Sequence, residues 1–448
     1  MKNRVIRTTL GTILTLTLLG CGEGENSNTP LQTITNEDID KVPDISQQPE
    51  SNVDSNLQIP AIIPSGHTKL LIGQTFWNEF DDYIEGIGTA PAGSSHYAEL
   101  YTGQINQGHD GVQMDANGDP LLNSDGTVIT LSDNYETPFL DHMYREYPNA
   151  TVMIAISIKD NPAAGGYSGR NAGYKAIKAI NQGMWDQKID LLATKFKDYP
   201  QMTFMVRIGY EVSLLALANV EDAEFCEVLD FYNSQGINIF DDISVVDGDN
   251  KIDYKAYHNA YNRIADRIRN VNHATNVKFL YHPVRGFGEV KTLYPGDQYV
   301  DYIAFSVFNH DIGMGTDETF DDPNQTLTIR SIGIGGWTLD DNLRQSLDWS
   351  RDIINKPIII AESAYQNAPP EWKDYIDSPY NNPMIEYLER LTSLVNTYDI
   401  RALTYINSDW QSHGWPKQWA DSRVEIQQET KNYWIDHVIN NSRFMQYE

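Results

Sequence analysis

Short apolar runs alternate along this chain with longer segments in which apolar residues recur at helical spacing. A run such as Thr151–Ile158 (TVMIAISI) is typical of a strand that is buried on both faces of a parallel sheet. Segments such as Tyr254–Asn272 lie between these runs, and their apolar residues fall on one stripe of a helix. This alternation predicts an α/β fold with a mostly parallel sheet.

Eight runs of the strand type predict a closed (β/α)8 TIM barrel, with one catalytic domain and long βα loops. We expect strands over residues 69–74, 97–101, 151–158, 203–211, 277–281, 301–307, 356–362 and 402–406. We expect helices over 187–197, 254–272, 343–354 and 425–439, and another that begins at Asn382–Pro383. A doubly wound open sheet would alternate in the same way, but no strand here is followed by a G-x-G-x-x-G loop.

The first residues of the chain have the pattern of a secretory signal. Lys2, Arg4 and Arg7 precede a short apolar stretch, which ends in Leu18–Cys21 (LLGC). That ending resembles a bacterial lipobox, which implies cleavage before Cys21 and attachment of lipid to its thiol; an ordinary cleaved signal is the alternative. We predict a lipoprotein signal peptide over 1–21, a flexible polar linker over 22–66, and the catalytic domain over 67–448.

Charge narrows the range of partners. The formal net charge is −29, and the basic patch that nucleic-acid binding requires is missing from the sequence. We expect no nucleic-acid partner, no cofactor and a monomer. The leader indicates a protein of the bacterial cell envelope, held by Cys21 in the outer membrane and facing the periplasm or the cell surface.

Two predicted strands each deliver one carboxylate to the same end of the barrel. The strand over 203–211 (TFMVRIGYE) ends on Glu211, and the strand over 356–362 (KPIIIAE) ends on Glu362. By strand count these are the fourth and the seventh strands. A carboxylic acid and a carboxylate that face each other are what a retaining glycosidase needs, whereas each Glu taken alone is as compatible with an ion pair.

At these residues the chain resembles the retaining glycoside hydrolases of clan A, and most of all glycoside hydrolase family 26. That family contains β-mannanases and some β-1,3-xylanases and glucanases. Residues 207–211 (RIGYE) resemble its Arg-Pro-x-His-Glu motif, 359–362 (IIAE) its nucleophile strand, and 294–303 (YPGDQYVDYI) its approach to strand six. Tyr210 stands where the family has His, and Phe308 stands near the expected position of a Tyr that hydrogen-bonds the nucleophile.

The resemblance implies hydrolysis of a β-linked polysaccharide by double displacement. Glu362 would be the nucleophile and Glu211 the acid/base. Arg207 lies on the same strand face as Glu211 and would supply hydrogen-bond donors. We therefore expect a divergent member or relative of the family that acts on mannan, β-1,3-xylan or a related glycan.

Further residues that follow the strands are predicted to bind substrate. Trp77 and Trp410 would offer ring faces to sugars, although core packing is the alternative for each. The other predicted contacts are Tyr210, His282, Arg285, Asn309 and His310. No His-x-x-x-His or comparable ligand cluster accompanies His310, so we predict no metal site.

Two other functions stay open. Basic residues near the mouth, such as Arg285, suit an anionic substrate, so one alternative is hydrolysis of a sulfated algal galactan or fucan. The other alternative is a surface lipoprotein that binds glycans and does not cleave them; the replacements at Tyr210 and Phe308 favour this reading, and the two glutamates speak against it.

Overall fold

A computed structural model describes residues 60–73, 77–100, 104–106, 138–158, 176–212, 254–283, 287–312, 339–366, 382–410 and 421–447. The predicted signal peptide with Cys21 lies outside these residues, and so does most of the predicted linker. Both therefore stay predictions. No described helix is long and apolar enough to cross a bilayer.

Within these ranges, eight parallel strands close into a barrel, which confirms the predicted (β/α)8 fold. Strand β1 pairs with β2 on one side and with β9 on the other, so the sheet has no open edge between them. The barrel strands are β1 (Thr68–Gly73), β2 (Gly93–Glu99), β4 (Thr151–Ser157), β5 (Thr203–Ile208), β6 (Val277–Tyr281), β7 (Tyr302–Phe308), β8 (Ile358–Ala364) and β9 (Ala402–Ile406).

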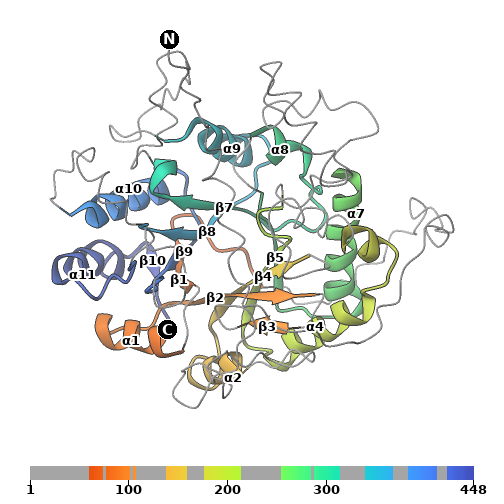
Figure 1. The fold of residues 1–448 in the computed structure, drawn as a ribbon, viewed down its shortest axis with the longest axis horizontal. Coiled ribbons are helices and arrows are strands. Elements are labelled where there is room, and N and C mark those ends of the chain that lie inside the picture. The colour runs from red at the N-terminus through yellow and green to blue at the C-terminus, as the bar shows by residue number, and fades with distance from the viewer. Residues whose placement is uncertain are drawn as a thin grey trace, which may run out of the picture.

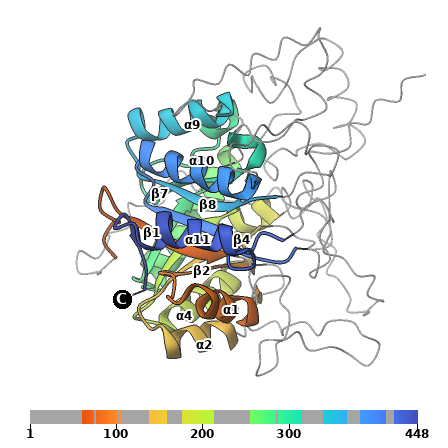
Figure 2. The ribbon, with the colours of Figure 1, turned by 90° about the vertical axis from the view of Figure 1, so that its left-hand side faces the viewer.

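Helices surround the barrel. They are α1 (Trp77–Ile87), α2 (Pro138–Glu146), α4 (Asp186–Asp198), α7 (Tyr254–Asp266), α8 (Phe287–Thr292), α9 (Asp341–Asp352), α10 (Pro383–Thr397) and α11 (Gln428–Trp434). Figure 1 shows them as a ring around the strands. Figure 2, turned by 90°, shows the barrel strands between α9 and α10 on one side and α1 and α2 on the other.

Two short strands extend the sheet outside the barrel. Strand β3 (Gln104–Asn106) pairs antiparallel with β2. Strand β10 (Phe444–Met445) pairs with β1 near the C-terminus of the chain.

Several predicted boundaries were wrong. Strand β2 begins at Gly93 instead of residue 97. A Cβ at position 93 would lie 1.6 Å from the carbonyl oxygen of Thr151, so only glycine allows β2 to approach β4 this closely. Strand β8 does not stop on Glu362 but continues to Ala364. The predicted start of α10 is confirmed, since the Asn382 side chain accepts a hydrogen bond from the amide of Met384.

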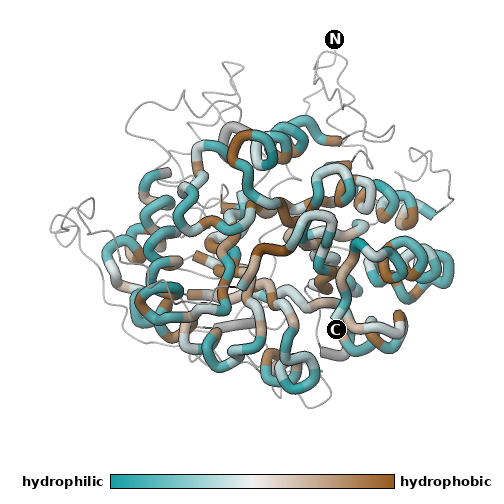
Figure 3. Tube along the Cα trace, turned by 180° about the vertical axis from the view of Figure 1, so that it is seen from behind, coloured by the Kyte–Doolittle hydropathy of each residue, from teal (hydrophilic) through white to brown (hydrophobic). Residues whose placement is uncertain are grey.

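The apolar core has two layers, one between the strands and the helices and one inside the barrel. Figure 3 shows hydrophobic residues concentrated in the central strands and hydrophilic residues on the outer helices. The layer inside the barrel takes alternate residues of the strands. We call it the lower layer, because its residues precede the carboxyl ends of the strands. It contains Leu71, Met153, Met205, Leu280, Tyr302, Ala304, Ile359, Ala361 and Ala402.

Residues before β1 cover the lower end of the barrel. Ile63 is only 6% exposed and belongs to the lower layer, its amide donates to the hydroxyl of Tyr302 at 2.8 Å, and its carbonyl accepts from Arg401. We predicted a linker up to residue 66. The folded body therefore includes at least the last part of that span.

Candidate active site

The turn after β5 places Glu211 at the carboxyl end of the fourth barrel strand. Gly209 has φ 67°, and a Cβ there would lie 2.8 Å from Cδ1 of Ile158, so this position requires glycine. Glu211 itself has φ 50°, a conformation that costs a residue with a side chain about 1 kcal/mol. The turn is held by Tyr257, whose hydroxyl donates to the Ile208 carbonyl, and by the Val212 amide, which donates to the His282 carbonyl. Such local strain is often found at functional sites.

A β-bulge in β8 turns Glu362 toward the barrel interior. Phe305 of β7 pairs with Ile360, but Ser306 pairs with Glu362, so Ala361 is an extra residue. Ala361 faces the interior with the lower layer. Strict alternation would then point Glu362 outward, but the extra residue gives two successive inward side chains.

Two donors hold one oxygen of Glu362. Nη1 of Arg207 lies 2.5 Å from Oε1, and the hydroxyl of Tyr97, on β2, lies 3.1 Å from the same atom. Arg207 is fully buried and Glu362 is 8% exposed. Burial lowers the pKa of Arg207, but the negative charge and hydrogen bond of Glu362, together with the nearby Tyr97 and Tyr210, outweigh burial, and the pKa is raised. The guanidinium therefore stays charged beside the Glu362 carboxyl group.

A chain of hydrogen bonds leads from Arg207 to Glu211. Nη1 of Arg207 lies 3.3 Å from Nδ1 of His282, Nε2 of His282 lies 3.2 Å from the hydroxyl of Ser306, and that hydroxyl lies 2.9 Å from Oε1 of Glu211. We call this the Arg207–Glu211 chain. It joins the ends of β5, β6 and β7 and brings the two predicted glutamates into one network.

The direction of this chain follows from its first donor. A guanidinium can only donate, so Nδ1 of His282 accepts and Nε2 carries the hydrogen. Ser306 then accepts from His282 and donates its own hydrogen to Glu211. Burial, followed by the positive charge of Arg207, lowers the pKa of His282 well below its usual value. His282 is therefore neutral, as this chain requires.

Aromatic rings surround the guanidinium. The centroids of the Tyr97 and Tyr210 rings each lie 5.6 Å from Cζ of Arg207, and the two rings contact each other edge to face at 5.1 Å. Tyr210, predicted to bind substrate, thus contacts the side chain that holds Glu362. Tyr97 contacts both Glu362 and the segment that carries Glu211.

Trp410 is buried among apolar side chains, so its ring face is not exposed. It is 2% exposed and clusters with Phe308, Ala364 and Ile406 at the carboxyl ends of β7, β8 and β9. Its Nε1 donates to the hydroxyl of Ser422 at 2.9 Å. In this position the ring shapes the mouth of the barrel, and a stacking role stays a prediction.

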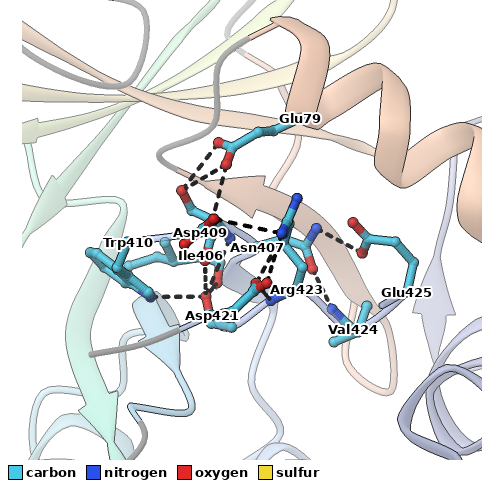
Figure 4. Close-up of polar contacts among 11 residues, drawn as sticks. Glu79, Ile406, Asn407, Asp409, Trp410, Asp421, Arg423, Val424 and Glu425 are labelled. Atoms are coloured by element: carbon cyan, nitrogen blue, oxygen red, sulfur yellow. Dashed lines mark hydrogen bonds and ion pairs between the residues drawn. The ribbon is translucent and has the colours of Figure 1, made fainter. Parts of the chain in front are cut away.

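A polar cluster fixes the segment that carries Trp410 (Figure 4). The buried carboxylate of Glu79, on α1, accepts from the Ser408 hydroxyl and the Asp409 amide at 3.1–3.2 Å. Arg423 forms ion pairs with Asp421 at 2.7 Å and Asp409 at 3.8 Å. Asp409 and Asp421 also form an isolated antiparallel bridge, so the residues on both sides of 411–420 are joined.

The remaining predicted contacts divide into two groups. Asn309 is 8% exposed; its side chain accepts from the Gln366 amide at 2.9 Å and donates to the Gln366 carbonyl, so it ties the end of β7 to the end of β8. Trp77 begins α1 and His310 lies in a 3-10 turn, but neither side chain is among those described. Arg285 lies outside the described residues.

Tyr97 and Ser306 are the two site residues that the sequence reasoning missed. Ser306 had a visible signal, since it is one polar residue in the otherwise apolar run of β7 (YIAFSVF). Tyr97 had only its place in a predicted strand. Within the described ranges, no group of three or more His, Cys, Asp or Glu residues has the geometry of a metal site.

Comparison with known proteins connects this geometry to a family. The model of glycosyl hydrolase family 26 matches residues 247–327. A β-1,3-xylanase of a Vibrio species is 21% identical over 415 residues, which is 86% of this chain and 67% of the relative. A β-1,3-xylanase of an Alcaligenes species is also 21% identical, over 86% of this chain and 66% of the relative. The chain thus spans about two thirds of the length of these relatives.

A solved structure has the same fold. GH26C from Muricauda sp. MAR_2010_75 superposes with a TM-score of 0.50 at 13% identity, covering 85% of this chain and 87% of that one. The family match, the two xylanase relatives and the shared barrel agree with the resemblance seen in the sequence. The chain is a glycoside hydrolase that resembles glycosyl hydrolase family 26.

Proposed function

We propose that the protein is a retaining endo-β-glycosidase, with Glu362 as the nucleophile and Glu211 as the acid/base. One observation carries the proposal: the ends of barrel strands four and seven bring both carboxylates into one hydrogen-bonded network. Arg207 forms an ion pair with Glu362, and a carboxylate is the form in which a nucleophile acts. Glu211 is half-buried at the edge of the network, where it can reach a leaving group.

In the first step, the Glu362 carboxylate attacks the anomeric carbon while the bond from this carbon to the leaving oxygen breaks. Glu211 gives its proton to that oxygen. Since Oε1 of Glu211 accepts from Ser306, the proton that Glu211 delivers resides on Oε2. The products of this step are a glycosyl ester on Glu362 and a shortened chain that departs as an alcohol.

In the second step, water attacks the anomeric carbon and the bond to Glu362 breaks. Glu211, now ionised, takes one proton of the water, and Glu362 regains its negative charge. Two inversions at the same carbon leave its configuration unchanged. Arg207 stays charged throughout and holds Glu362 before and after the covalent stage.

The substrate class that we favour is β-1,3-xylan, because both curated relatives are named β-1,3-xylanases. A screen of β-1,3-xylan, β-mannan, mixed-linkage glucan, agar, carrageenan and fucan tests this choice, with products identified by mass. Rapid loss of viscosity with oligosaccharide products indicates mid-chain cleavage, whereas release of one short product indicates exo action. Cleavage of a sulfated galactan or fucan alone, or binding without cleavage, would select one of the alternatives.

Stereochemistry and variants test the mechanism. Proton NMR of the first product should show the β-anomer before mutarotation, and an α-anomer would exclude double displacement.

Glu362→Gln should lower kcat/KM by about 10⁴ or more. Glu211→Gln should spare an activated aryl glycoside more than the polysaccharide, because a good leaving group needs no proton. Glu85→Gln, on the exposed face of α1, is the matched control. Unchanged turnover in Glu362→Gln would overturn the assignment.

A further inference from the structure

Both hydrogen bonds that the structure gives to Glu362 end on the same oxygen. Arg207 and Tyr97 donate to Oε1, at 2.5 and 3.1 Å. Among the described residues, Oε2 receives no hydrogen bond. A carboxylate fixed by one oxygen keeps the lone pairs of the other for attack, so the two oxygens of Glu362 have different surroundings.

We propose that Tyr97 is a positioning residue for the nucleophile: with Arg207 it fixes Oε1 of Glu362, so that Oε2 is the atom that attacks the sugar. This inference rests on the proposed function and adds a residue from the second barrel strand to it. The bond that forms joins Oε2 to the anomeric carbon. When water completes the reaction that bond breaks, and Oε1 keeps its two donors throughout.

The position of Tyr97 suits this role for two reasons. Arg207 approaches Glu362 from β5, whereas Tyr97 approaches it from β2, so donors from two strands set the orientation of the carboxylate. The Tyr97 ring also contacts Tyr210 at 5.1 Å, next to Glu211. A single side chain thus sets the nucleophile relative to the segment that bears the acid/base.

Tyr97 remains a donor across the working range of pH. Burial, and then the negative charge of Glu362, raise the pKa of Tyr97 well above its usual value, although Arg207 opposes this. The phenol therefore keeps its proton and stays a hydrogen-bond donor to Glu362. Among the described residues, the charged and titratable groups around Tyr97 and Glu362 are Arg207, Tyr210 and Glu211 from β5 and its turn, and His282 from the end of β6.

Tyr97→Phe removes the hydroxyl and keeps the ring. We expect kcat/KM to fall about 10- to 100-fold, mostly in kcat, which corresponds to the loss of a hydrogen bond to a charged group. The acid limb of the kcat/KM profile should move to higher pH, because a carboxylate that loses a donor is protonated more easily. A residue with a merely structural role would lower the melting temperature without moving this limb.

Tyr302→Phe is the matched control. Tyr302 also faces the barrel interior, but its hydroxyl lies at the lower end and accepts from the amide of Ile63. This variant should lower stability and leave the kcat/KM profile in place. Incorporation of 3-fluorotyrosine at Tyr97 is the second test; it keeps the shape of the side chain, and its more acidic phenol should move the acid limb to lower pH.

The outcomes separate this inference from the proposed function. If Glu362→Gln is inactive while Tyr97→Phe has the same profile as Tyr302→Phe, the positioning role is overturned and the nucleophile stands. If Glu362→Gln is fully active, the proposed function itself fails. A shift of the acid limb in Tyr97→Phe and the opposite shift with 3-fluorotyrosine together support the role of Tyr97.

Discussion

The lower layer of the barrel interior and the polar layer above it are built by the same strands, two residues apart. On β5 the lower residue is Met205 and the upper one is Arg207; on β7 the corresponding pair is Ala304 and Ser306. On β6, Leu280 lies in the lower layer, and His282 follows two residues later. Two residues further along each of these strands, the barrel interior therefore contains charged and hydrogen-bonded side chains instead of packed apolar ones.

The difference separates what the fold needs from what the reaction needs. Apolar side chains in the lower layer stabilise the barrel by leaving water. Buried charges above them are costly to desolvate, and a pair such as Arg207 and Glu362 is a poor way to gain stability. We infer that the upper layer is retained for its chemistry, and three substitutions test the contrast on one free-energy scale.

The largest effect is expected for Arg207→Met, which leaves the buried charge of Glu362 without its main partner. The free energy of unfolding should fall by about 3–5 kcal/mol at neutral pH, because an unpaired buried carboxylate is strongly unfavourable. Denaturant titration measures this loss. The double variant Arg207→Met/Glu362→Leu should regain most of the stability and stay inactive; a single variant as stable as the parent would contradict the contrast.

An intermediate effect is expected in the lower layer. Leu280→Ala leaves a cavity under the site and should cost about 2–5 kcal/mol of unfolding free energy. The kcat/KM of the folded protein should stay unchanged, since the Leu280 side chain lies in the apolar lower layer and not in the hydrogen-bonded network. Unfolding curves and kinetics on the same sample give both values. If activity falls while stability is kept, the two layers are not separate in function.

The smallest effect is expected for Ser306→Ala, which interrupts the Arg207–Glu211 chain. Loss of a hydrogen bond to a charged group is worth about 1.5–3 kcal/mol, so kcat/KM should fall roughly 10- to 100-fold. Ser363→Ala is its control, because this neighbouring buried hydroxyl on β8 donates to the Thr404 carbonyl at 2.8 Å and is not part of the Arg207–Glu211 chain. The control should lose about 1 kcal/mol of stability and no activity. Equal activity in the two variants would remove Ser306 from the site.

The barrel and the order of its strands could be predicted because apolar runs are a local pattern, although several strand boundaries were wrong. Apolar runs identified the strands, and Glu211 and Glu362 were found from their places at the ends of two of them. Tyr97 was missed because its partner, Glu362, is 265 residues away in the chain, and nothing near Tyr97 marks that contact. Likewise, Trp410 is recognisable as an aromatic residue after β9, but its burial depends on Phe308 and Ala364 from other strands.

The bulge at Ala361 could not be predicted for a different reason. The residues Ile358–Ala361 are all apolar, so the pattern is the same with or without an extra residue. The effect of the bulge appears only in the pairing with β7, where Ser306 pairs with Glu362. The sequence therefore identified Glu362 as a candidate, but it did not reveal the β-bulge that turns its side chain inward.

This bulge sets a rule for anyone who redesigns or aligns β8. Before it, odd-numbered positions such as Ile359 face inward; after it, even-numbered positions such as Glu362 and Ala364 do so. An alignment that places the gap after Glu362 instead of at Ala361 would therefore assign the wrong counterpart to Glu362. Deleting Ala361 would remove the bulge and leave Glu362 facing inward, because Glu362 would then follow the outward-facing Ile360 directly.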